Sequence, residues 1–348
     1  MRKLFLATLL LGSALMVNAQ SGTNSPYSQY GLGILSDQTS GFNRGMNGVG
    51  LGFHEHNQVN YLNPASYASI DSMTFILDAG ISGQVTNFEE NGVTKKTGVK
   101  KKKNANNSNF EYVVAGFRLL PHVGMSFGII PFTNVGYNYY QSKPKDMPSD
   151  MDFDYTNTYS GDGGLHQAYI GAGWEPVKGL AVGANFSYLW GSIDRSVSNS
   201  YSNSYYKTLT RYYSMQVNSY KVDFGVQYTH QFSKKDWATV GVTFSPGHGL
   251  GASADMKIIS NDTQNGVTDT TAYSIDKAYK LPTMIGAGVM WNHNNQWKVG
   301  FDYSLQKWGS LGYPSFDGTN YALKNGIYKD RSKFNLRSEE HTSELQSP

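Results

Sequence analysis

A two-residue alternation of apolar with polar or small side chains recurs along the chain from Ser72 onward. In residues 180–190, Leu180, Val182 and Ala184 alternate with small or polar residues, and four other stretches show the same period. This is the period of a β-strand that has one apolar face. The sequence therefore predicts an all-β fold, with the clearest strands at residues 73–81, 123–129, 180–190, 221–232 and 297–308.

The face of these strands opposite the apolar one is small and polar rather than charged, which favours a membrane β-barrel over a soluble β-sandwich. A sandwich also alternates, but it usually has shorter strands and more charge on its exposed face. Here only 16% of residues are charged, against about 25% in a typical soluble domain. A mean hydropathy of −0.45 does not argue against a barrel, because alternating strands average out to near-polar values. Aromatic residues mark the strand ends, as girdles of a barrel do, at Trp190, Trp237, Trp291, Trp297 and Trp308.

Short and long connections alternate strictly between the predicted strands. Outer-membrane barrels have short periplasmic turns and long extracellular loops, so the alternation assigns a side to each connection. It predicts nine complete strands, with a tenth beginning near Arg331. The short links are at 120–122, 176–179, 233–236 and 293–295, and the long ones at about 86–108, 141–163, 197–217, 246–280 and 310–330.

The two ends of the chain differ from the strand region. Residues 1–19 predict a signal peptide, with a basic start, a short apolar run and small residues before Gln20; an uncleaved N-terminal anchor is the alternative. Residues 20–71 form a periplasmic or hatch segment, and residues 72–336 an incomplete transmembrane barrel. Residues 337–348 resemble the translation of a sequencing adapter, so we expect the chain to be a fragment truncated at its C-terminal end.

A glycine-rich stretch, residues 44–71, precedes the first strand. Its glycines disfavour both a helix and a strand, and its Asn63-Pro64-Ala65 tripeptide predicts a turn in which the Asn63 side chain bonds nearby backbone. An irregular segment before a barrel pattern suggests something packed inside the barrel. We therefore predict a hatch in the lumen, built around Asn63, Pro64 and Ala65, with Gly45, Gly48, Gly50 and Gly52 allowing close packing.

The order of these features resembles the FadL-like outer-membrane transporters of long-chain fatty acids and other hydrophobic compounds. The resemblance covers residues 40 to 310: the Asn-Pro-Ala tripeptide before the first strand, then Leu281-Pro282, a glycine-bearing strand at 285–291, Trp297 and Trp308. It implies an antiparallel barrel of about 14 strands when intact, of which 9–10 are present, closed by an N-terminal hatch and opened by a lateral gap in its wall.

Polar residues on the inner face of the strands are the candidate lumen residues. A charge facing lipid costs several kcal/mol, so these side chains must face the lumen. There they either pair with one another and hold the hatch, or contact a substrate. The set comprises Asp78, Arg118, Glu175, Lys221, Asp223, Asp302 and Gln306.

Two motifs could carry other chemistry. His54-Glu55-His56 offers two imidazoles for a metal, but no further ligand follows nearby, and hydrogen bonding within the hatch or to the wall is the simpler role. Ser245 and His248 lie close in sequence, but no partner for a catalytic triad is evident and the segment suits a loop. The chain has no cysteine, which removes thiolate chemistry and disulfides. We expect no enzyme, no cofactor and no resident metal.

The predicted outer loops carry basic and aromatic residues. The lysines of residues 100–103 either meet anionic lipopolysaccharide or are simply solvated. The tyrosines either capture a hydrophobic ligand or pack within the loops and at the membrane interface. They are Tyr137, Tyr139, Tyr140, Tyr155, Tyr159, Tyr201, Tyr205, Tyr206, Tyr212 and Tyr213.

These features predict a passive outer-membrane channel for long-chain fatty acids or other hydrophobic small molecules, gated by the hatch. The alternative is an accessory outer-membrane barrel of a secretion or adhesion system. The expected partners are the ligand, outer-membrane lipid and lipopolysaccharide, and the expected state is a monomer. A net charge of +3 is too small to argue for nucleic acid.

Overall fold

The computed structural model describes residues 25–89, 102–142, 155–294 and 296–340. The predicted signal peptide, 1–19, lies outside these residues. The main sheet contains, in chain order, β2 (Phe75–Glu89), β3 (Lys102–Leu120), β4 (Val123–Ser142), β5 (Tyr155–Val177), β6 (Leu180–Tyr201), β7 (Thr208–Gln231), β8 (Asp236–Ser245), β13 (Met284–His293), β14 (Trp297–Gln306) and β17 (Arg331–Glu340). A hairpin of β10 (Ala254–Asp262) and β11 (Val267–Ile275) extends this sheet along β7.

The remaining elements are short. They are β1 (Ile34–Leu35), β9 (His248–Gly249), β12 (Lys280–Leu281), β15 (Tyr313–Phe316), β16 (Tyr321–Lys324), α2 (Gly41–Gly45) and the 3₁₀ helices η1 (Pro26–Gln29), η2 (Pro64–Ser69) and η3 (Trp308–Ser310). Within the described residues no helix is long and apolar enough to cross a membrane.

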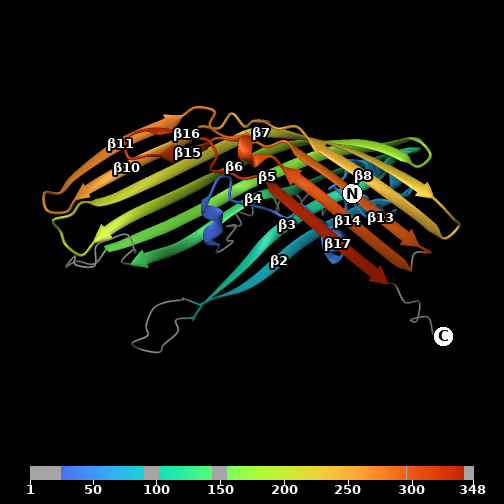
Figure 1. Ribbon diagram of the computed structural model, residues 1–348, viewed down its shortest axis with the longest axis horizontal. Helices are drawn as coiled ribbons and strands as arrows, with labels where there is room; N and C mark the ends of the chain where they lie inside the picture. The colour runs from blue at the N-terminus through green and yellow to red at the C-terminus, as the bar shows by residue number, and fades with distance from the viewer. Residues whose placement is uncertain (1–24, 90–101, 143–154, 295, 341–348) are drawn as a thin grey trace, which may run out of the picture.

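The main sheet runs β2-β3-β4-β5-β6-β7-β8-β13-β14-β17, and every neighbouring pair along it is antiparallel (Figure 1). The predicted all-β fold is confirmed. Among the described residues this path contains nine strands and β17, whereas the predicted strand count of the intact barrel stays a prediction. In the part of the chain that the structure describes, β2 and β17 do not pair with each other, so a closed barrel of about 14 strands stays a prediction.

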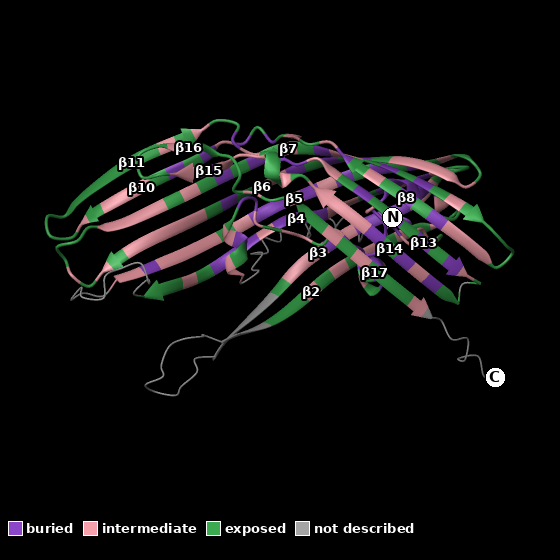
Figure 2. Ribbon diagram, in the orientation of Figure 1, coloured by how far each residue is buried: buried purple, intermediate pink, exposed green. Residues whose placement is uncertain are grey.

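One face of the sheet is covered and the other is open. In β6, Asn185, Ser187 and Leu189 are buried, whereas Phe186 and Tyr188 are 55% and 50% exposed. Figure 2 shows the same striping of buried and exposed residues along neighbouring strands. We call the side with Asn185 the covered face and the side with Phe186 the open face. The predicted alternation is therefore present, with the apolar residues on the open face.

Several strands are longer than the sequence suggested. The described residues of the stretches expected as loops at 141–163 and 197–217 are mostly strand, because β4 to β7 continue into them. Tyr137 and Tyr159, for example, lie within β4 and β5, and only Tyr205 and Tyr206 of the predicted loop tyrosines lie outside strands. Tyr and Thr are common in β-strands, so these strands extend beyond the residues at which apolar and polar side chains alternate. β17 likewise continues through Glu340, past the predicted boundary at 336.

The N-terminal segment, residues 25–71, packs against the covered face (blue in Figure 1). It contains three short helices that the sequence did not suggest, η1, α2 and η2. The Ser40 side chain caps α2, and Asn63 caps η2, whose first residue is Pro64. Proline suits the first position of a helix, because it has no N–H to leave unpaired there. Asn63-Pro64-Ala65 is thus the start of a 3₁₀ helix rather than an isolated turn.

A row of glycines on the covered face brings the two backbones together. Gly124, Gly173, Gly183 and Gly225 lie opposite one another on β4, β5, β6 and β7. A Cβ atom at Gly124 would lie 1.8 Å from the Tyr67 carbonyl oxygen, and one at Gly183 would lie 2.4 Å from the carbonyl carbon of Pro64. The start of η2 therefore fits the sheet only because these positions lack side chains.

Gly183→Ala should lower stability and loosen the N-terminal segment. The new methyl group meets backbone that cannot rotate away, and such overpacking typically costs about 1–3 kcal/mol. Urea unfolding in detergent and the rate of limited proteolysis near residue 64 would measure both effects. Gly83→Ala in β2 is the matched control, since nothing lies within 4 Å of its added Cβ. Equal stability of the two variants would contradict the close backbone contact.

Candidate functional site

Asn63 joins three parts of the molecule. Its side-chain Oδ1 accepts from the Ala65 N–H at 3.1 Å, which is the local bond that starts η2. Its Nδ2 donates to the Leu51 carbonyl at 2.8 Å and to the Val226 carbonyl of β7 at 3.3 Å. Asn63 is fully buried, so one amide satisfies the helix start, the glycine-rich stretch and the sheet without water.

Two side chains of the sheet hold the backbone around Leu51. The Asp302 carboxylate of β14 accepts from the N–H groups of Gly50 at 2.7 Å and Leu51 at 2.9 Å. Gln227 of β7 donates from Nε2 to the carbonyls of Leu51 at 2.9 Å and Phe53 at 3.1 Å. A buried backbone group without a partner is costly, and here the sheet supplies the partners that the irregular segment cannot supply itself.

Ion pairs connect the N-terminal segment to the two sides of the sheet. Arg44 contacts Glu111 of β3 at 2.6 Å, and Glu55 pairs with Lys298 of β14. Asp37 lies 3.3 Å from Lys333 of β17. Arg118 of β3 adds a hydrogen bond of 3.0 Å from its guanidinium to the Ala68 carbonyl. These contacts hold the segment from strands at both ends of the sheet.

β4 loses its neighbour part of the way along its length. The β3–β4 ladder ends at the pair Val113↔Ile129, although both strands continue beyond it. A register shift between Pro131 and Thr133 in the β4–β5 ladder follows directly. Figure 1 shows the β2–β3 hairpin diverging from β4 on that side. The edge of β4 beyond Ile129 therefore needs other partners.

The first part of the N-terminal segment supplies those partners. β1 pairs with β4 through Ile34↔Asn134 and Leu35↔Thr133. The Ser36 N–H donates to the Phe132 carbonyl at 3.0 Å, and the Ser25 N–H donates to the Gly136 carbonyl at 3.1 Å. A short additional strand thus occupies the place that β3 leaves.

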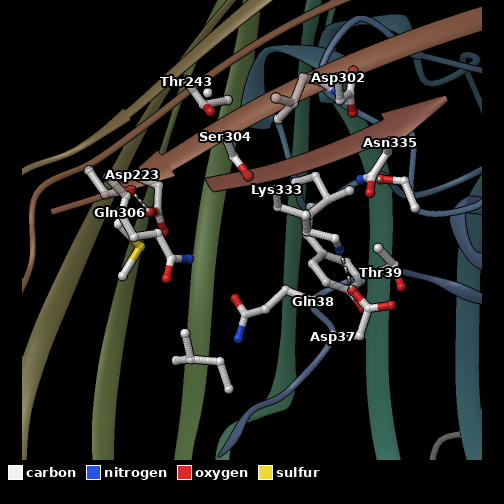
Figure 3. A pocket seen from close by; sticks show the side chains of 18 of the residues that line it. Asp37, Gln38, Thr39, Asp223, Thr243, Asp302, Ser304, Gln306, Lys333 and Asn335 are labelled. Carbon is white, nitrogen blue, oxygen red and sulfur yellow. Dashed lines mark hydrogen bonds and ion pairs between the residues drawn. The ribbon is translucent and has the colours of Figure 1, made fainter. Parts of the chain in front are cut away.

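A cavity of about 270 Å³ lies between the N-terminal segment and β7, β8, β13, β14 and β17. Its lining is polar on one part, where Lys221 pairs with Asp223, which also accepts a hydrogen bond from Ser245. Figure 3 shows Lys333 facing Asp37 across the same space, with side chains of β14 and β17 above it. Leu51, Tyr61 and Phe132 supply apolar lining as well.

The predicted lumen residues have four different surroundings. Arg118 and Asp302 contact the N-terminal segment directly, and Lys221, Asp223 and Gln306 line the cavity. Asp78 accepts from the Tyr112 hydroxyl at 3.1 Å, and that hydroxyl also accepts from the Gly41 N–H. Glu175 lies at a short turn, where it accepts from the Gly179 N–H at 2.7 Å and contacts His122 at 3.3 Å.

The four predicted glycines have different surroundings. A Cβ at Gly52 would lie 2.8 Å from the Thr239 carbonyl oxygen of β8, so Gly52 touches the sheet. Gly50 touches Leu62 of its own segment, and Gly48 has a positive φ of 75° beside Asn335 of β17. Nothing lies within 4 Å of a Cβ at Gly45, so contact with the sheet does not require glycine there.

Sequence reasoning missed Gln227 and the glycine row. In the sequence, Gln227 and Gly225 fall on the small or polar face of the predicted strand at 221–232, and their residue types alone do not mark them as contacts of the N-terminal segment. The signal was present in the pairing register, since Gly124, Gly173, Gly183 and Gly225 line up only once neighbouring strands are aligned. The register in which β4 to β7 pair cannot be read from the sequence alone.

Most side chains of the motifs weighed for metal binding and catalysis have structural partners, but the buried His54 Nδ1 and His248 Nε2 have no hydrogen-bond partner among the described residues. His56 Nδ1 lies 2.8 Å from the Ser69 carbonyl oxygen, and Glu55 pairs with Lys298. Ser245 bonds Asp223, while the His248 ring stacks on Tyr220 with centroids 4.4 Å apart. No group of three metal-ligating side chains occurs among the described residues. Lys100 and Lys101 lie outside the described residues, and Lys102 and Lys103 belong to β3.

Asp302→Asn should release the backbone at Gly50 and Leu51. Hydrogen bonds to a charged group contribute about 1.5–3 kcal/mol, so these two amides should exchange with deuterium roughly tenfold to a hundredfold faster. Hydrogen-exchange mass spectrometry of the segment would measure this. Asp269→Asn on exposed β11 is the control, and identical exchange in both variants would contradict the role of Asp302.

Comparison with solved structures supports the fold. A Pseudomonas aeruginosa FadL homologue superposes with a TM-score of 0.56 and 11% identity, covering 90% of this chain and 78% of that chain. The CymD monoaromatic hydrocarbon channel gives a TM-score of 0.53 and 14% identity over 90% and 81% of the two chains. The Pseudomonas putida toluene transporter TodX gives 0.51 and 12% over 91% and 82%. The predicted resemblance to the FadL-like proteins is confirmed in its fold.

Sequence comparison identifies the family more narrowly. No curated protein matches the chain closely enough to count as a relative. The family model of BamG matches residues 1–338, which is nearly the whole chain. The chain therefore belongs to the BamG family and has a FadL-like fold.

Proposed function

We propose that this protein is a passive channel of the bacterial outer membrane for small hydrophobic molecules. The apolar open face supports a membrane location, since Phe186, Phe224 and Val240 are 55%, 48% and 50% exposed on adjacent parts of the sheet. Soluble proteins rarely expose a continuous apolar surface of this kind. Relatives in fold are named as transporters of toluene and as monoaromatic hydrocarbon channels, and this supports the substrate class proposed.

The observation that carries the proposal is the interrupted β3–β4 ladder. In lipid every backbone polar group needs a partner within the protein, so an unpaired stretch of β4 is tolerated only where something covers it. Residues 34–36 provide that cover with few hydrogen bonds. Their withdrawal would open a lateral path through the wall between β3 and β4.

The N-terminal segment acts in this proposal as a hatch with a fixed and a movable part. Residues 44–71 are fixed by Asn63, Gln227, Asp302 and the glycine row. Residues 25–38 are held by β1 and by side-chain and backbone hydrogen bonds to β4, β5 and β6, without the backbone-to-backbone packing that holds η2. A molecule captured outside would enter the cavity beside the hatch, and movement of residues 25–38 would then release it toward the membrane. Long-chain fatty acids and aromatic hydrocarbons both fit this description.

Locking β1 to β4 with a disulfide should block transport. Leu35 and Thr133 are directly paired, and opposite residues of antiparallel strands lie within disulfide reach. Because the chain has no cysteine, Leu35→Cys with Thr133→Cys creates a single defined crosslink. Uptake of a labelled hydrophobic compound by cells expressing the oxidised variant should fall to the level of channel-free cells and return on reduction.

Each single cysteine variant serves as the control and should transport normally under oxidising conditions. If the oxidised double variant takes up the compound as fast as the single variants do, the proposed lateral path is wrong.

A second candidate is an accessory barrel of a secretion or adhesion system. The cavity beside the hatch favours it, since Asp37, Lys221 and Asp223 line the space and a pocket for hydrophobic ligands is usually mostly apolar. Purification in mild detergent separates the two candidates. A partner protein in equal amount and no bound lipid or hydrocarbon would favour the accessory role, whereas a monomer with bound apolar ligand would favour the channel.

A further inference from the structure

A second cavity, of about 330 Å³, lies at the end of the sheet away from its short turns. One side is formed by residues 30–35 of the N-terminal segment and the other by Trp308, Tyr328, Lys329 and Arg331. The latter belong to the connection between β14 and β17 and to the first residue of β17. The cavity shares Leu35 and Arg331 with the polar cavity described above, so the two spaces adjoin.

The charge of this cavity is one-sided. Lys329 and Arg331 line it, and no aspartate or glutamate does. Asp330 stands between them in sequence, but its carboxylate accepts from the Gly309 N–H at 2.7 Å and does not line the space. Among the described residues neither Lys329 nor Arg331 has an ion-pair partner. Two such cations facing one cavity favour an oxyanion there.

The rest of the lining is aromatic with polar edges. Tyr30 is 58% exposed, and the rings of Trp308 and Tyr328 lie 6.0 Å apart. Trp308 is oriented by a hydrogen bond of 2.9 Å from its Nε1 to Gln306. Burial raises the pKa of Tyr328, so its hydroxyl stays protonated at neutral pH and can donate. Flat rings that also donate hydrogen bonds suit a ligand with both apolar faces and hydroxyl groups.

A third cation stabilises the cavity from behind. The Arg195 guanidinium of β6 donates from Nη2 to the Gly31 carbonyl, and its Nε has no partner in the described residues. Gly31 has a φ of +56°, and a Cβ there would lie 2.7 Å from the Tyr328 hydroxyl. Arg195 therefore fixes a tight backbone position in the cavity wall and adds to its positive charge.

We propose that this cavity binds an acidic saccharide presented from outside the cell. The carboxylate or sulfate of the sugar pairs with Lys329 and Arg331, and its ring lies against Tyr30, Trp308 and Tyr328. Both cations are exposed, and a hydrocarbon in the same place would offer them no partner, whereas a carboxylate or sulfate would. The inference does not depend on transport, since an accessory barrel could carry the same site.

Isothermal titration of the purified full chain in detergent tests this site. The probes are a galacturonic acid trisaccharide and maltotriose, its uncharged counterpart. The acidic sugar should bind at least about tenfold more tightly, since hydrogen bonds to charged groups are the stronger ones. The double variant Lys329→Gln with Arg331→Gln should lose this preference, and Lys257→Gln, on exposed β10, should keep it.

Further variants and a bare anion complete the test. Trp308→Ala should weaken both sugars, because it removes the ring rather than the charge, and heat-dependent migration on gels would verify that each variant is folded. Equal affinity for the two sugars, or an unchanged preference in the double variant, would overturn the site. So would inorganic sulfate displacing the acidic sugar at equal concentration, because the cavity would then take a bare oxyanion and not a saccharide.

Discussion

The structure depends on how the edge of β4 is satisfied beyond Ile129. A strand that faces lipid must have its N–H and C=O groups paired on both sides, and β3 withdraws from β4 at that point. Residues 25–36 supply the missing bonds from inside. The N-terminal segment is therefore part of the sheet through β1 as well as packed against its covered face. This dual role links its position to the integrity of the sheet.

The remainder of the segment is held in a different way. Around Pro64 the contact is between two backbones, made possible by glycines on four adjacent strands. Around Leu51 it is a set of hydrogen bonds from Asp302, Gln227 and Asn63. Packing of this density leaves little freedom. A segment with one part packed backbone to backbone and another part hydrogen-bonded to β4, β5 and β6 would suit gating, and the same anchoring would serve a closed structural barrel.

Much of the fold followed from the sequence, because the two-residue period decides which side of each strand is apolar. The split between the open and covered faces in β6 was predicted, as were the antiparallel order and a bond from the Asn63 side chain to nearby backbone. The lengths of β4 to β7 were not, since tyrosine and threonine ladders continue where apolar alternation stops. The role of Gln227 and the glycine row could not be read either, because both depend on pairing between distant strands. In the sequence, Pro131 is the only local feature that marks where the pairing between β3 and β4 ends.

The central claim is that residues 25–38 open separately from the rest of the segment and from the sheet. Native-state hydrogen exchange at Ser25 and Ser36, whose amides bond to β4, measures this most directly, because local opening exposes an amide at lower free energy than global unfolding. The account predicts that these amides exchange well before those of Leu51 and of the β5–β6 ladder. Exchange of all of them at one common rate, set by global unfolding, would contradict it.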